Sequence, residues 1–398
     1  MLGGRNYHCQ CGQPVFFLNS KCLACQTPLG YEPERGRLLP LMPGPQPDTW
    51  RLWQAPSAPE ADANLAGKED APVYKRCSNL TTPARCNWLV PLQDPLELCR
   101  ACRLNRTIPD LSNAAEPDNG YLWGLVEVAK RRLVSSLILL HLPVASRISE
   151  DPERGLMFDF LRSPANGPHV MTGHDTGLIT LSVDEADDTE REAVRKAMHE
   201  PYRTLLGHFR HEVGHYFWDR LVAGTPWMDG FRQIFGDETA NYAASLQRNY
   251  EQGPPSDWPL HFVSAYASTH PLEDWAECWA HYLHMRDGID TALSLGLSLD
   301  RSDLEVTPFT LDDLYQPNHP QAEQFLAFLN HWTRLTTMLN EMSRSMGQSD
   351  FYPFVLPREV VSKLHFIHLV VISRSQMQLQ SHDQAQTQTQ SPGLRASA

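Results

Sequence analysis

The sequence lacks a long apolar run and an apolar leader. Its most apolar piece, LVSSLILLHLPV at 133–144, is too short to span a bilayer. The opening residues MLGGRNYHCQCG have no apolar core of the kind that signal peptides carry. We therefore expect a cytoplasmic protein that has no contact with a membrane.

An excess of positive charge is also absent. The 398 residues include 34 Lys and Arg against 47 Asp and Glu, so the formal net charge is −13. This balance disfavours binding to nucleic acid or to anionic membranes by the chain as a whole. With 41% hydrophobic residues and ten tryptophans, the composition is that of a globular protein long enough for two or three domains.

Cysteine is scarce in most of the chain and concentrated at its start. Eight of the nine cysteines precede residue 103, and the ninth is Cys278. In a reducing compartment, clustered cysteines are more often metal ligands than disulfides. The asymmetry therefore predicts a separate N-terminal module.

Composition and apolar periodicity divide the chain into three parts. We expect a cysteine-rich module at 1–110, a second domain at 118–374 and a disordered Gln- and Ser-rich tail at 375–398. Within the module, residues 40–72 are rich in Pro, Ala and acidic residues and predict an extended loop or linker.

Helical periodicity dominates the second domain, so we expect an α+β fold that is mainly helical with a small β-sheet. The runs GLMFDFL and GLITLSVDEAD predict the strands. A helix carrying HEVGH should begin near Pro201, because proline suits the first turn. Further helices are expected at 231–251, 271–287, 321–346 and 357–373.

The cysteines of the module form two groups of four. These are Cys9, Cys11, Cys22 and Cys25, followed by Cys77, Cys86, Cys99 and Cys102. Each group suits a closed tetrahedral thiolate site for Zn²⁺, which leaves no position for water and is therefore structural. Such a metal supplies folding energy to a module with a small core. The alternative is that the cysteines are incidental core residues.

The charge of the module points away from nucleic acid. Residues 1–110 contain 12 Lys and Arg and 10 Asp and Glu. Eight thiolates and two zinc ions would make the metal-loaded module slightly acidic, without the basic surface of a phosphate binder. We expect instead a role in contacting a protein partner or docking a substrate.

The motif HEVGH places two histidines on one helical face. His211 and His215 are four residues apart, so both imidazoles can bind one zinc ion. Glu212 points elsewhere and is suited to take a proton from a zinc-activated water. Gly214 lets another element pack closely. The alternative is a pair of histidines that are hydrogen-bonded in a polar core.

A third ligand is expected some sixty residues downstream. Glu273 and Glu277, in EDWAE, share a helical face among tryptophans, where two carboxylates are costly unless a cation compensates them. We assign Glu273 as the ligand and Glu277 as the acceptor that orients a ligand histidine, and the reverse assignment stays open. Tyr266, just before this helix, is placed to stabilise an oxyanion.

Two further positions carry weaker signals. His208 lies one turn before His211 and suits a helix face or a supporting contact rather than metal ligation. His174 and Asp175, in TGHDTG, sit at a turn before the expected strand at 177–183 and suit either a turn or a substrate contact.

These motifs together resemble a known family. HEVGH with EDWAE is similar to zincins of the gluzincin type, and the spacing of Tyr266, Glu273 and Glu277 is similar to that of the anthrax lethal factor type. The cysteine groups, CNWLVP, GLMFDFL, TGHDTGLITL, EPYRTLLGHFRHEVGHYFWDRL, FGDE and SAYASTHPLEDWAECWAHYLH resemble bacterial zinc-binding metallopeptidases over about 5–370. Those proteins join a zinc ribbon to an HExxH domain, which implies a zincin-like fold here.

The resemblance and the residues lead to one hypothesis and one rival. The hypothesis is a zinc peptidase with one catalytic and two structural zinc ions, acting on a peptide or protein substrate. The catalytic zinc would be held by His211, His215 and Glu273, with Glu212 as the general base and Tyr266 on the oxyanion. The rival is a zinc-stabilised protein-binding or regulatory protein whose HExxH site is structural or vestigial.

Overall fold

The computed structural model describes residues 5–53, 71–164, 166–197, 204–299, 304 and 309–389. The strands are β1 Tyr7–His8, β2 Pro14–Val15, β3 Leu29–Glu32, β4 Arg37–Pro43, β5 Trp50–Leu52, β6 Tyr74–Arg76, β7 Leu89–Pro91, β8 Asn105–Thr107, β9 Met157–Leu161, β10 Gly173–Asp175 and β11 Leu178–Ser182. The helices are α2 Asn119–Leu139, α3 Asp188–Ala197, α4 Leu205–Leu221, α5 Met228–Ile234, α6 Tyr242–Gln252, α7 Trp258–His261, α8 Pro271–Ser294, α9 Ala322–Ser345 and α10 Arg358–Thr389.

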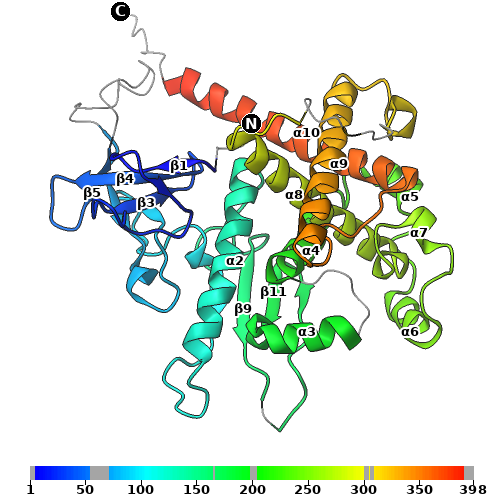
Figure 1. Ribbon diagram of the computed structural model, residues 1–398, viewed down its shortest axis with the longest axis horizontal. Coiled ribbons are helices and arrows are strands. Elements are labelled where there is room, and N and C mark those ends of the chain that lie inside the picture. The colour runs from blue at the N-terminus through cyan, green and yellow to red at the C-terminus, as the bar shows by residue number, and fades with distance from the viewer. Residues whose placement is uncertain are drawn as a thin grey trace, which may run out of the picture.

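The α+β fold class is confirmed. The N-terminal module holds a two-stranded sheet, β1-β2, and a five-stranded sheet in the order β3-β4-β5-β6-β7. A third sheet has the order β10-β11-β9-β8 and lies in the mainly helical part. Figure 1 shows the blue N-terminal sheets on one side of α2 and most of the other helices on its opposite side.

The predicted loop at 40–72 is partly wrong. The run LLPLMP belongs to β4, and β5 follows it before the chain leaves the described residues at 54–70. Leu41 of β4 is buried and packs in a small cluster with Tyr74 and Leu89 from other strands of the sheet. Burial of apolar side chains across the sheet outweighs the loop propensity of the prolines.

The single helix predicted at 231–251 is also wrong. It is two helices, α5 and α6, separated by a turn in which Gly236 has a φ of +104°. The Asn241 side chain accepts a hydrogen bond from the backbone N–H of Ala244 at 3.0 Å and so begins α6 as its N-cap. Helical periodicity alone does not reveal this cap.

Two predicted helix limits differ from those in the structure. The helix with HEVGH begins at Leu205, where Thr204 in an extended conformation accepts a hydrogen bond from Gly207 N at 3.0 Å; Pro201 lies outside the described residues. At the other end of the chain, α10 continues to Thr389, beyond the predicted start of a disordered tail at 375. Residues 390–398 lie outside the described residues.

The third sheet supports the helix that carries HEVGH. The strands predicted from GLMFDFL and GLITLSVDEAD are β9 and β11, which pair in parallel. Phe158 and Phe160 of β9 pack edge-on against Phe209 of α4, with ring centroids 5.6 and 6.0 Å apart. β8, which precedes the predicted domain boundary, pairs with β9. One continuous core of buried residues therefore spans both parts of the chain.

Helices α4 and α8 are in close contact at Gly214. A Cβ atom at this position would lie 2.9 Å from the Cα atom of Ala276, which is too close for any other residue. Trp275, which is fully buried, donates a hydrogen bond from Nε1 to the Gly214 carbonyl at 2.8 Å. The contact brings the two signature segments of the sequence within reach of each other.

A buried ion pair ties α8 to α10. Lys363 Nζ lies 2.7 Å from Asp274 Oδ2 and donates to the His261 carbonyl at 2.7 Å, and both charged side chains are almost fully buried. Removing one member of such a pair leaves an uncompensated buried charge.

Asp274→Ala should therefore lower the free energy of unfolding by about 3–5 kcal/mol, measured by denaturant titration. In the matched control, Asp350→Ala, the partner Arg344 is half exposed and the change should be far smaller. Equal effects of both variants would contradict this expectation.

Among the described residues, none of the helices combines the length and the hydrophobicity that a membrane span requires.

Candidate metal centre

Three predicted ligands converge where α4 meets α8. His211 Nε2 lies 3.0 Å from Glu273 Oε2, and His215 Nε2 lies 3.4 Å from Glu273 Oε1. One ligand atom from each of the three residues lies within 4.8 Å of the other two. The two histidines are one turn apart on α4, and Glu273 comes from the first turn of α8.

The donor set fits a zinc ion. Ligands about 2.1 Å from a tetrahedral metal lie roughly 3.4 Å from one another, and the Glu273 carboxylate group lies at comparable distances, 3.0 and 3.4 Å, from the two imidazole nitrogens. Glu273 is 1% exposed, and its Oε2 atom has no hydrogen-bond partner among the described residues. Its polar neighbour is the imidazole of His211 at 3.0 Å, and a buried carboxylate is costly unless a proton on such a neighbour or a cation compensates its charge. The residues present therefore suit a His₂Glu zinc site.

The electrostatics of the cluster also favour a cation. Burial raises the pKa of Glu273, but its contacts with His211 and His215 outweigh burial and hold the pKa well below its usual range. Burial lowers the pKa of His211, yet Glu273 and Glu277 raise it well above its usual value. Without a metal, a proton on His211 supplies the positive charge that the carboxylates require.

Glu277 lies behind His211, on the side away from Glu273. His211 Nδ1 donates to Glu277 Oε1 at 2.7 Å, and the Ser264 hydroxyl donates to Glu277 Oε2 at 2.6 Å. Burial raises the pKa of Glu277, but the contact with His211 prevails and lowers it to about 2. A carboxylate in this position orients the imidazole and leaves Nε2 free to bind a metal. The structure thus brings Glu273, rather than Glu277, to both histidines.

A pocket of about 390 Å³ opens beside the three predicted ligands. Glu212 and Tyr266 both line it, together with His174 and Asp175. Glu212 is 5% exposed, and its Oε1 lies 3.8 Å from His208 Nε2. The ring of Tyr266, in the short 3₁₀ turn before α8, has its centroid 6.0 Å from that of His211. The pocket therefore gathers every residue for which the sequence predicts a catalytic role.

Two residues beside the predicted metal ligands make contacts of their own. His208 Nδ1 lies 2.6 Å from Glu185 Oε2, which agrees with a supporting position rather than ligation. His174, on the edge strand β10, stacks on His215 with centroids 6.3 Å apart, and its Nε2 accepts a hydrogen bond from Gly177 N. Burial lowers the pKa of His174 to about 4, so the ring is neutral at pH 7.

Sequence reasoning missed Tyr242, the first residue of α6. Its hydroxyl donates to Glu273 Oε1 at 2.7 Å, and its side chain lines the pocket. Burial, and after it the negative charge of Glu273, raises the pKa of Tyr242. No local sequence pattern predicts this contact, because Tyr242 and Glu273 lie on different helices that meet only in the folded chain. The N-cap signal of Asn241 is the one feature that could have placed the start of α6 here.

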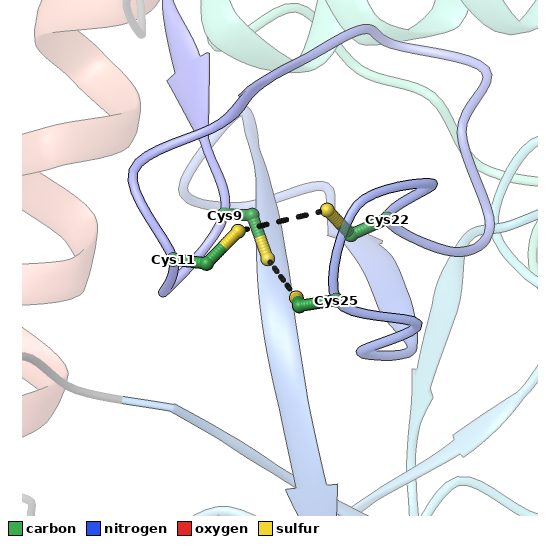
Figure 2. Close-up of side chains that lie close together, drawn as sticks. All are labelled: Cys9, Cys11, Cys22 and Cys25. Atoms are coloured by element: carbon green, nitrogen blue, oxygen red, sulfur yellow. Dashed lines mark hydrogen bonds between the residues drawn. The ribbon is translucent and has the colours of Figure 1, made fainter.

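The first cysteine group lies in loops around β1 and β2. Cys9 Sγ and Cys25 Sγ are 3.4 Å apart, and Cys11 Sγ and Cys22 Sγ are 3.9 Å apart. Figure 2 shows the four side chains pointing toward one another from two loops. Sulfurs about 2.3 Å from a tetrahedral zinc ion lie roughly 3.8 Å apart, whereas a disulfide is close to 2 Å. The spacing suits a shared metal, and none of these cysteines forms a disulfide.

The second group, Cys77, Cys86, Cys99 and Cys102, is almost fully buried. Cys86 Sγ lies 3.6 Å from Cys99 Sγ. Cys102 Sγ lies 3.9 Å from Glu127 Oε2 of α2, and Glu127 in turn pairs with the fully buried Lys130 at 2.6 Å. This cluster therefore forms part of the contact between the module and α2. The first group differs, since Cys11 and Cys25 are exposed.

A larger pocket, of about 570 Å³, lies on the N-terminal module. The Arg76 guanidinium stacks 5.0 Å above the Trp50 ring at its wall, and Lys75 is paired with Glu97 nearby. Its described lining contains no histidine or cysteine. Of these two pockets, the smaller one, between α4 and α8, is the one that candidate metal ligands line.

A closed cysteine module joined to a helical domain with a His₂Glu cluster defines a class of zinc-binding proteins. Residues 119–370 match the family model described as "Putative zinc-binding metallo-peptidase", and residues 6–113 match a zinc-ribbon domain. The chain belongs to this metallopeptidase family. It is 41% identical over 374 residues to uncharacterized proteins of Mycobacterium tuberculosis and Mycobacterium bovis, covering 92% of this chain and 95% of each relative. No solved structure matches the chain.

Proposed function

We propose that the protein is a zinc-dependent peptidase that hydrolyses peptide bonds in a peptide or protein substrate. The observation that carries this proposal is the convergence of His211, His215 and Glu273 beside a pocket that also contains Glu212. Three protein ligands leave one coordination position open, which distinguishes a catalytic from a structural zinc site. Membership of the metallopeptidase family supports the same reaction class.

The proposal assigns a task to the three ligands, to Glu212 and Tyr266 in the pocket, and to Glu277 behind His211. A zinc ion bound by the three ligands would polarise the scissile carbonyl and make a water molecule more acidic. Glu212, one residue from His211, accepts a proton from the attacking water and delivers it to the leaving amine. Tyr266 donates its hydroxyl proton in a hydrogen bond to the developing oxyanion. Glu277 holds the His211 ring in the tautomer that leaves Nε2 unprotonated.

The two cysteine groups would hold structural zinc, which gives three zinc ions per chain. Four thiolates occupy all positions of a tetrahedral ion, so these sites stabilise the module rather than activate water. Phe16 and Leu23, in the loops of the first group, are 72% and 82% exposed. We propose this surface as the contact for a protein partner, in a cytoplasmic protein whose cysteines remain reduced.

A mixed peptide library tests the peptidase proposal directly. The purified full-length protein should cleave a subset of peptides, and a chelator should abolish cleavage that added zinc restores. Mass spectrometry of the products would also define the residues preferred on either side of the cleaved bond. Absence of zinc-dependent cleavage across the library would instead favour the rival function, a zinc-stabilised binding protein.

A further inference from the structure

Tyr242 is held next to the metal-ligand cluster from two sides. Its hydroxyl donates to Glu273 Oε1, and its ring packs edge-on against His270 with centroids 5.2 Å apart. His270 is the N-cap of α8: its Nδ1 accepts a hydrogen bond from Leu272 N, and its Nε2 donates to the Ala240 carbonyl at 3.0 Å. The start of α6 and the start of α8 are thereby fixed to each other, with Tyr242 between them.

The two carboxylate oxygens of Glu273 have different surroundings. Oε1 accepts the hydrogen bond from Tyr242, while Oε2 is buried without a hydrogen-bond partner among the described residues. Oε2 is also the oxygen closer to a histidine nitrogen, at 3.0 Å from His211 Nε2 against 3.4 Å between Oε1 and His215 Nε2. A hydrogen bond to a charged carboxylate is roughly twice as strong as one between neutral groups.

We propose that Tyr242 is a positioning residue that makes Glu273 a monodentate zinc ligand through Oε2. This inference rests on the zinc site of the proposed function. With Oε1 engaged by Tyr242, one oxygen rather than two is presented to the metal, so a coordination position stays available for water. The hydrogen bond also limits rotation of the carboxylate, since partners outside the ligand set orient metal ligands and tune their affinity.

Tyr242→Phe in the full-length protein removes the hydroxyl and keeps the ring. We expect the zinc dissociation constant of the His₂Glu site to rise about 10- to 100-fold, as is typical when such partners are lost. Competition with a chromophoric chelator measures this dissociation constant. The signal of a variant that carries both His211→Ala and His215→Ala is subtracted, so that zinc bound by the cysteine groups does not contribute. In the cobalt-substituted protein, the visible absorption of this site should weaken as Glu273 becomes bidentate and the coordination number rises.

Two other tyrosines provide matched controls. Tyr250→Phe, on the same helix, removes the hydroxyl of a side chain that is 65% exposed and should change neither measurement. Tyr266→Phe should lower turnover but keep the zinc affinity and the cobalt spectrum of the wild type. This contrast separates a residue that positions a ligand from one that contacts the reacting atoms.

The proposal is overturned if Tyr242→Phe binds zinc and cobalt as the wild type does. A lower thermal midpoint with unchanged zinc affinity would also overturn it, because Tyr242 would then only join α6 to α8. Failure of the peptidase proposal is distinguishable. If the wild type cleaves no peptide but Tyr242→Phe still weakens zinc binding and changes the cobalt spectrum, the positioning role stands without the hydrolase.

Discussion

Glu212→Gln should reduce peptide hydrolysis by a factor of roughly 10²–10⁴, the contribution typical of a general base, while the zinc content stays at the wild-type value. Glutamine has nearly the shape of glutamate but cannot accept a proton from water at neutral pH. Glu212 is not among the three converging ligands, so its replacement leaves the metal donors intact. Steady-state kinetics on a peptide from the library measures the loss of hydrolysis. Inductively coupled plasma mass spectrometry measures the zinc content.

The control for this variant is Glu323→Gln, an exposed glutamate in the first turn of α9. It removes the same charge at a residue that does not line the pocket and should leave kcat/KM unchanged. Wild-type activity in Glu212→Gln would exclude Glu212 as the base. Loss of zinc together with activity would show that Glu212 supports the metal rather than the proton transfer.

Cys102→Ser should remove one zinc ion per chain and unfold much of the N-terminal module. Structural zinc contributes about 10–16 kcal/mol of binding free energy in small zinc domains, comparable to or larger than the whole stability of a typical domain. Cys102 is fully buried, and its cluster adjoins Glu127 and Lys130 of α2. Its loss should therefore also lower the unfolding midpoint of the helical domain, measured by near-ultraviolet circular dichroism and limited proteolysis.

Cys25→Ser provides the matched comparison at the other cysteine group. Cys25 is exposed, so this variant should lose one zinc ion with a smaller effect on the helical domain. Cys278→Ala, outside both groups, should keep all three zinc ions, because Cys278 is a buried core residue of α8. A Cys102→Ser protein that retains three zinc ions per chain and the wild-type midpoint would contradict a structural site at the second group.

Much of the candidate site can be predicted from the short-range spacing of residues in the sequence. His211 and His215 are four apart on a helix, so their shared face follows from 3.6 residues per turn once the segment is helical. The same periodicity places Glu273 and Glu277 on one face of α8. Cysteines a few residues apart bring their sulfurs together across tight turns. The catalytic and ligand roles of these residues stay predictions, whereas their proximity is a property of the structure.

Helix limits were harder to predict because they depend on caps and on packing. The apolar period runs from α5 into α6, yet the chain turns between them at Gly236 and restarts at the Asn241 cap. The Pro-rich stretch in β4 forms a strand because its leucine side chains are buried against neighbouring strands. These outcomes depend on partners that are distant in sequence, and a local pattern does not contain them.

The sequence by itself determined the family, the fold class and the sets of side chains that can bind metal, since each depends on residue type and local spacing. Only the tertiary structure decided which of the two glutamates reaches both histidines and that Tyr242 hydrogen-bonds to Glu273. Those facts depend on how α4 crosses α8 at Gly214 and on where α6 begins. Close packing fixes such geometry through contacts between segments that are distant in the sequence. The spacing of residues within one segment does not contain this information.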